Sequence, residues 1–143
     1  MLVLVALILS SGLLWGFGRM MGGNMARHHQ SMMGGVPAPF RGVRNPLPAN
    51  EEVIRRGAEL FQANCAVCHG EQGYGDGPAG KGLSPPPANI NRLMRMPMMA
   101  LDDYLFWTIS DGGKSFGSAM PAFRDSLDEQ SRWAIIHYLR RLP

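Results

Sequence analysis

Two cysteines and a histidine lie together in the stretch NCAVCHG, residues 64–70. Cys65 and Cys68 are the only cysteines of the chain, and His69 directly follows the second one. Cys-x-x-Cys-His is the attachment signature of c-type haem. Each thiol adds to one vinyl group of the porphyrin, and the adjacent imidazole lies under the iron as the proximal ligand. The spacing therefore predicts one covalently bound haem c at Cys65, Cys68 and His69.

Other chemistries also use paired cysteines. A thioredoxin-like redox pair belongs in a βαβ setting, and the chain has no strand-like alternation of useful length. A zinc site needs further ligands at suitable spacing, but the other histidines, His28, His29 and His137, are far away in sequence. The remaining alternative is a small disulfide loop that precedes a histidine by chance.

The second axial position of the iron decides the function. An open position permits O₂ or peroxide chemistry, whereas a protein ligand leaves electron transfer. Met120 is the candidate ligand, in the stretch FGSAMPAF. The small residues 117–119 let the backbone approach a haem face, and Pro121 biases Met120 away from the helical region. A thioether ligand favours Fe(II) and raises the reduction potential.

Other side chains compete for this position. Four methionines, Met94, Met96, Met98 and Met99, lie in LMRMPMM, and Met96 also precedes a proline. They lack the small-residue approach, so we assign them to lining a loop over the haem edge. His137 falls within a predicted helix and is interpreted as a surface or packed histidine.

Helices must position these side chains. Asn50 can cap a helix that runs into the cysteine motif, with Glu51 and Glu52 in its first turn. Residues 70–98 are too rich in glycine and proline for a long helix. The sequence predicts an all-α domain over residues 50–143.

Two more helices follow. One is predicted over residues 100–110, with Gly112–Gly113 ending it. The last is predicted over residues 126–142, where Ser126 and Glu129 match a capping box.

Residues 1–21 form a hydrophobic segment. Residues 2–17 carry no charge and would span about 24 Å as a helix, short of the ~30 Å hydrocarbon core. Continuing through Met21, with Arg19 snorkelling, makes a span. We predict a single-pass transmembrane helix; a cleaved signal peptide is the alternative, although its basic n-region is missing.

Residues 22–49 are predicted to be a Gly/Pro/Met-rich linker, first flexible and then semi-extended. Within it and just before it, thioethers and imidazoles crowd together at Met20, Met21, Met25, His28, His29, Met32 and Met33. Such ligands suit Cu(I), so Met20–Met33 is a candidate copper site. The simpler interpretation is that these methionines pack against lipid or a partner subunit.

The net charge of +3 is unevenly distributed. Residues 1–50 carry four arginines and no acid, so the excess of positive charge belongs to them. Residues 51–143 are slightly acidic and lack the clustered basic face of a nucleic-acid-binding domain.

Residues 50–143 resemble a class I c-type cytochrome. The matching residues are Gly57, Phe61, CAVCHG, GDGPAGKGLSPPPAN, DGGKSFGSAMPAF, Trp133 and Tyr138. The domain is particularly similar to monohaem electron-carrier subunits of haem–copper oxidases and related respiratory complexes.

The resemblance implies that Cys65 and Cys68 carry the thioether bonds and that His69 and Met120 are the axial ligands. It also implies that a carbonyl among Pro85–Pro87, which we take to be Pro86, accepts a hydrogen bond from His69 Nδ1–H. The first and last helices would cross where Gly57 permits close contact with the ring of Tyr138.

These inferences predict a membrane-tethered electron carrier rather than an enzyme. It would lie on the periplasmic side of a bacterial inner membrane, as a carrier in a respiratory or photosynthetic chain or as a subunit of a larger complex. The alternatives are a haem enzyme or gas sensor with a labile sixth ligand, and a copper-handling protein. Against the enzyme, no histidine or arginine other than Arg124 is close to Met120 in sequence, and we interpret Arg124 as a partner of a propionate or a surface acid.

Overall fold

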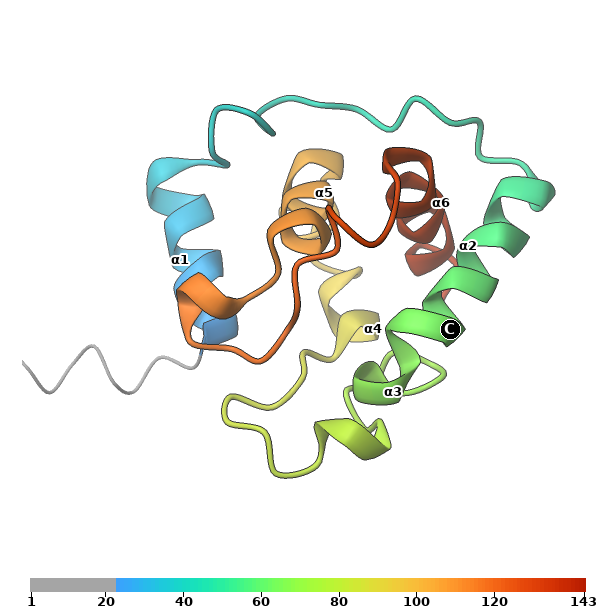
Figure 1. The fold of residues 1–143 in the computed structure, drawn as a ribbon. Coiled ribbons are helices and arrows are strands. Elements are labelled where there is room, and N and C mark those ends of the chain that lie inside the picture. The colour runs from blue at the N-terminus through green and yellow to red at the C-terminus, as the bar shows by residue number, and fades with distance from the viewer. Residues whose placement is uncertain (1–22) are drawn as a thin grey trace, which may run out of the picture.

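The computed structural model describes residues 23–143, with side chains from residue 26 onward. Its elements are α1 (Gly23–Gly34), α2 (Glu51–Asn64), α3 (Ala66–His69), η2 (Pro78–Gly80), α4 (Ile90–Leu93), α5 (Asp102–Asp111), η3 (Lys114–Phe116) and α6 (Glu129–Leu139) (Figure 1). This part of the chain has no strand, as predicted. The hydrophobic helix predicted within residues 1–21 lies outside the described residues. None of the described helices combines the length and apolar character that crossing a membrane requires.

Helix α2 begins where the sequence predicts. The Asn50 side chain accepts a hydrogen bond from the Val53 amide at 2.9 Å, and Glu51 and Glu52 occupy the first turn. These groups satisfy the unpaired amides and the positive end of the helix dipole. The face with Ile54, Gly57 and Phe61 is buried. The helix ends at Asn64, directly before the cysteine motif.

Helices α2 and α6 cross at Gly57, as expected from the sequence (Figure 1). A Cβ at this position would overlap the carbonyl group of Ala134 and would lie 3.0 Å from Tyr138 Cβ. The closest neighbour is thus the Ala134 backbone, whereas the ring of Tyr138 packs on Phe61 with 5.3 Å between centroids. Only glycine allows this separation of the two helices.

The core lies between α5 and α6. The rings of Phe106 and Trp133 stack at 3.9 Å with 9° between their planes, and both are buried. The side chains of Phe61, Ile135 and Ile136 are fully buried around them. Burial of this kind is the main stabilising contribution to a small domain.

The predicted start of the last helix is wrong. It begins at Glu129 rather than residue 126, and its N-cap is Asp128, which accepts from the Ser131 amide at 2.6 Å. Asp128 has the extended backbone of a capping residue, so it takes the role that we gave to Ser126. Helix α5 runs over Asp102–Asp111 and ends at Gly112 in a positive-φ conformation, as the glycine pair predicted.

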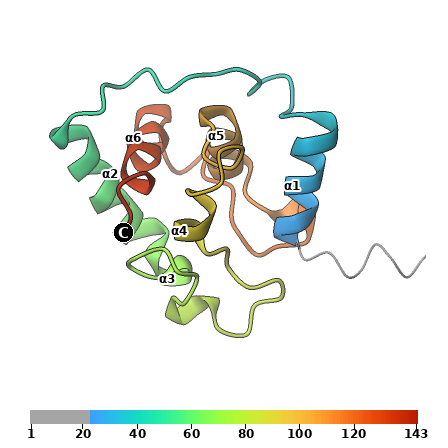
Figure 2. The same cartoon turned by 180° about the vertical axis from the view of Figure 1, so that it is seen from behind.

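The predicted irregular linker is wrong in two respects. Residues 23–34 form helix α1, and residues 41–48 are docked on the domain. We call residues 41–48 the strap. In both orientations the chain between α1 and α2 runs across one end of α5 and α6 (Figures 1 and 2).

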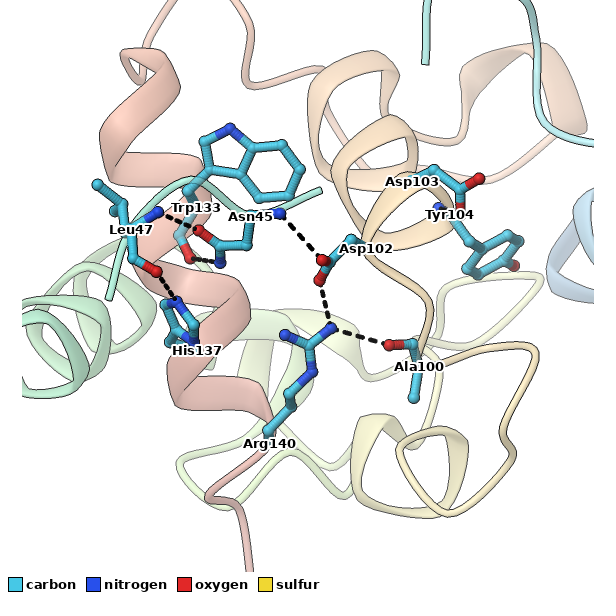
Figure 3. A network of polar contacts seen from close by, with 9 residues as sticks. All are labelled: Asn45, Leu47, Ala100, Asp102, Asp103, Tyr104, Trp133, His137 and Arg140. Atoms are coloured by element: carbon cyan, nitrogen blue, oxygen red, sulfur yellow. Dashed lines mark hydrogen bonds and ion pairs between the residues drawn. The ribbon is translucent and has the colours of Figure 1, made fainter. Parts of the chain in front are cut away.

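Hydrogen bonds hold the strap to both helices (Figure 3). The Gly42 amide donates to Asp103 at 3.1 Å, and the Asn45 amide donates to Asp102 at 2.9 Å. The Asn45 side chain donates to the Trp133 carbonyl on α6 at 2.9 Å. His137 Nε2–H donates to the Leu47 carbonyl at 2.9 Å, so His137 is a packed histidine, one of the two roles that the sequence predicts for it.

Asp102 links the strap to α6, because it also accepts from Arg140 at 2.6 Å. Burial acts to raise the pKa of Asp102, but the hydrogen bonds from Asn45 and Arg140 and the charges of Arg140 and Arg44 outweigh it, so the pKa is lowered. A depressed pKa in the folded state stabilises the protein above the unfolded value of about 3.9, and this contribution is lost as pH falls through the folded pKa.

We therefore expect Asp102→Asn to lower the free energy of unfolding by about 1–2 kcal/mol at pH 7. The variant should also lose less stability than the unaltered protein between about pH 5 and pH 2. Urea unfolding at a series of pH values measures both effects, with Glu52→Gln as an exposed first-turn control. Parallel acid profiles for Asp102→Asn and the unaltered protein would contradict the assignment.

Candidate functional site

The two cysteines and His69 lie on one turn at the end of α2. The amides of Cys68 and His69 donate to the Cys65 carbonyl at 3.1 and 2.9 Å, and the Cys65 amide donates to the Phe61 carbonyl at 2.8 Å. Helix α3 therefore continues directly from α2, and both thiols are free and half-buried. The structure brings these three predicted residues together on a rigid element.

The His69 ring is oriented by the backbone. Its Nδ1 lies 2.9 Å from the Ala88 carbonyl oxygen. Because a carbonyl oxygen can only accept, Nδ1 carries the proton and Nε2 keeps its lone pair. Burial lowers the pKa of His69, and the hydrogen bond to Ala88 acts in the opposite direction. The ring is thus neutral at pH 7, the form that binds a metal.

Our choice of Pro86 as the acceptor from His69 is wrong, because Ala88 accepts this hydrogen bond. The two residues are close in the same proline-rich stretch, and backbone carbonyls cannot be told apart by side-chain type. The sequence held no signal for Ala88. A role for Pro86 in binding the cofactor remains a prediction.

Residues 70–88 wrap tightly around α3. The Gly75 amide donates to the His69 carbonyl at 2.7 Å, and the Gly77 amide donates to the Cys68 carbonyl at 3.1 Å. A Cβ at Gly77 would meet backbone atoms of residues 66–68 at 2.6 Å. A Cβ at Gly75 would meet the Pro87 carbonyl oxygen at 2.7 Å. Close approach therefore requires glycine at both positions, and it brings Ala88 to His69.

The thiol of Cys65 is not a reactive thiolate. Burial, and secondly the charge of Cys68, raises the pKa of Cys65 to about 12. Redox-active cysteine pairs depend on a lowered pKa, so the thioredoxin-like alternative finds no support. Two thiols and a neutral imidazole with a free Nε2, held on one turn, fit the donor set of haem c.

Met120 lies outside any helix, between η3 and α6, as predicted. Its carbonyl accepts from the Gly113 amide at 2.9 Å, which fixes the segment on the end of α5. Its side chain is half-buried and packs against the core. In Figure 1 the segment after η3 runs beneath α5, on the other side of α4 from α3. Met120 is thus on a different element from His69, and its axial role remains a prediction.

The competing methionines differ in their surroundings. Met99 is 3% exposed within the core, whereas Met96 and Met98 are exposed. Arg124 pairs with Asp111, which is the surface-acid role we considered for it.

The copper site receives no support. No group of three or more His, Cys, Asp or Glu within residues 26–143 is arranged to hold a metal ion. Helix α1 spaces His28 and Met32 one turn apart, and Met32 is exposed. Met20 and Met21 lie outside the described residues, so the copper site at Met20–Met33 stays a prediction.

The sequence interpretation missed Arg27. This residue of α1 is 4% exposed, and its guanidinium lies over the rings of Trp107 and Phe116. An arginine in a glycine- and methionine-rich segment gives no signal of burial.

Two comparisons with known proteins point to cbb3-type cytochrome c oxidase subunits. The family model described as cytochrome c oxidase, cbb3-type, subunit III matches residues 52–139. The cbb3-type cytochrome c oxidase subunit FixP of Azorhizobium caulinodans is 44% identical over 36 residues, or 25% of this chain. The match spans 12% of that relative's length.

A solved structure shares the fold. It is the Kuenenia stuttgartiensis reducing HAO-like protein complex Kustc0457/Kustc0458, with a TM-score of 0.55 and 24% identity. The match covers 70% of this chain and 49% of that chain. At this identity the likeness concerns the fold alone.

Proposed function

The chain belongs to the family of cytochrome c oxidase, cbb3-type, subunit III, and on this premise we propose that it carries single electrons on one covalently bound haem c. The family is one of c-type cytochromes, which bind haem c, and the all-helical domain agrees with a class I cytochrome c fold. The number of haems, their attachment and the ligands are parts of the proposal.

One observation carries it: His69 directly follows Cys68 on the turn that holds both free thiols, and its Nδ1–H donates to the Ala88 carbonyl. Cys65 and Cys68 would hold the porphyrin by thioether bonds, and Nε2 of His69 would bind the iron. The hydrogen bond to Ala88 fixes the ring and raises its basicity. Haem bound here supplies a one-electron Fe(III)/Fe(II) couple.

Covalent attachment can be measured directly. The proposal expects haem to remain with the chain after denaturation in acid and detergent, with a c-type pyridine haemochrome of one haem per chain. Haem that separates from the denatured chain, or a ratio other than one, would contradict it.

Met120 would close the sixth position, which makes the protein a carrier rather than an enzyme. We expect Met120→Ala to open this position, so that the reduced haem binds CO and the midpoint potential falls because a soft ligand to Fe(II) is lost. Optical spectra with and without CO, and a redox titration, measure both effects. The exposed Met96 gives the control Met96→Ala, which should leave both unchanged.

If the reduced Met120→Ala protein binds no CO and its midpoint potential is unchanged, Met120 is excluded as the ligand. Rapid CO binding by the unaltered protein would instead favour the haem enzyme or gas-sensor alternative.

The carrier is proposed to be a non-catalytic subunit of a bacterial membrane oxidase complex, with its haem domain on the periplasmic side. The similarity to FixP, a cbb3-type cytochrome c oxidase subunit, supports a partner of this class. Purification of the tagged chain from detergent-solubilised membranes tests this, with the expectation that haem–copper oxidase activity co-purifies. Recovery of the chain without that activity would favour a free carrier.

A further inference from the structure

Arg27 is a buried cation whose two Nη groups have no acceptor in the described part of the protein. Its side chain is 4% exposed, and neither Nη1 nor Nη2 has a hydrogen-bond partner among the described residues. Buried charges in native proteins are paired, because an isolated charge loses its hydration without compensation. The side chain therefore lacks the anionic partner that a buried guanidinium ordinarily has.

Aromatic rings compensate only part of this loss. The guanidinium carbon lies 4.6 Å from the centroid of Trp107 and 4.5 Å from that of Phe116, in the corner formed by the two rings. Ring faces attract the charge but do not replace the acceptors that its N–H groups need. This corner fixes the guanidinium and leaves both Nη groups to bind a ligand.

The nearby carboxylates of the chain are engaged elsewhere. Asp102 and Asp103 at the start of α5 accept from the strap, and Asp111 at its end pairs with Arg124. Burial lowers the pKa of Arg27, and the group that acts in the opposite direction is the phenol of Tyr104. The anion is therefore not supplied by a side chain in the described part of the protein.

The buried guanidinium lies beside the segment that carries Met120. Trp107 is on α5, and Phe116 is in η3, four residues before Met120. The Phe116 amide donates to the Gly113 carbonyl at 2.9 Å, and the Gly113 amide donates to the Met120 carbonyl at 2.9 Å. Arg27 thus contacts the hydrogen-bonded turn from which Met120 is presented.

We propose that Arg27 binds a propionate carboxylate of the haem, so that α1 forms part of the cofactor site. This inference rests on the proposed function. A haem propionate is an anion that would arrive with the cofactor, and a guanidinium fork matches a carboxylate. Arg27 lies outside the family match of residues 52–139, so family membership does not assign this role.

The test uses the full haem-loaded chain and three variants. Arg27→Gln removes the charge, Arg27→Lys replaces the planar fork by a point charge, and Arg55→Gln removes an exposed charge on α2 that pairs with Glu59. We expect Arg27→Gln to shift the propionate bending mode in the resonance Raman spectrum and to lower the midpoint potential. Arg27→Lys should shift the mode less, and Arg55→Gln should change neither.

An unshifted mode in haem-loaded Arg27→Gln would overturn the proposal. If that variant does not accumulate, an unshifted mode in Arg27→Lys overturns it. A different result would be a midpoint potential of the unaltered protein that changes with the concentration of added phosphate while the mode stays unshifted in the variants. That result would overturn the proposal and assign the site to a free anion. Absence of haem from the unaltered protein would contradict the proposed function itself. The optical spectrum of the unaltered protein, recorded before any variant is made, tests for this absence.

Discussion

Replacement of His69 by alanine should leave a protein that holds no stable low-spin haem. The His69 ring is neutral, and the Ala88 carbonyl fixes its tautomer so that Nε2 is the free donor. No other histidine lies in the motif, so the proximal coordination bond would be lost outright. The measurement is the haem content per chain, from the pyridine haemochrome, together with the reduced spectrum of the undenatured protein.

His137→Ala is the matched control. His137 is also half-buried and also hydrogen-bonded to one carbonyl, that of Leu47. Its loss should lower the free energy of unfolding by about 1 kcal/mol and leave the haem content unchanged. A normal low-spin spectrum in His69→Ala would show that the proximal ligand is another residue.

Replacement of Gly57 by valine should destabilise the domain by about 3 kcal/mol or more, at the upper end of the effect of overpacking. The new Cβ would overlap the Ala134 carbonyl, and a backbone group cannot rotate aside as a side chain can. Helices α2 and α6 would have to separate, which opens the contact between Phe61 and Tyr138. Domains of this size are stable by only about 5–15 kcal/mol, so the loss is large.

Denaturant unfolding of the haem-loaded protein measures this loss. Gly34→Ala is the control, because a Cβ at Gly34 meets no atom within 4 Å and alanine favours a helix by up to about 1 kcal/mol. A Gly57→Val protein as stable as the unaltered one would mean that the two helices are not in close contact at this point.

Local signals account for what the sequence predicted correctly. The caps at Asn50 and Gly112 depend on neighbouring residues only, and Cys65, Cys68 and His69 are adjacent in the chain. Three features depended on distant residues and were missed. Asp102 lies in the first turn of α5, and its sequence position gives no sign that its carboxylate oxygens also bind Asn45 and Arg140.

The acceptor of His69 was misassigned because any carbonyl of residues 85–88 has the same chemistry. Helix α1 was missed because its glycines and methionines carry no period, and its position depends on Arg27 packing against α5 and η3. A contact between residues so far apart in sequence leaves no pattern in the sequence of α1 itself.

The strap changes how the carrier would meet its partner. A domain on a flexible linker samples a volume that grows with the length of the linker, and it finds partners by diffusion within that volume. Hydrogen bonds at Gly42, Asn45 and Leu47 hold residues 41–48 against helices α5 and α6. These residues therefore add no length to a flexible linker. If the domain works as the proposed electron carrier, its orientation, rather than the reach of a flexible tether, would then decide how a partner approaches its haem.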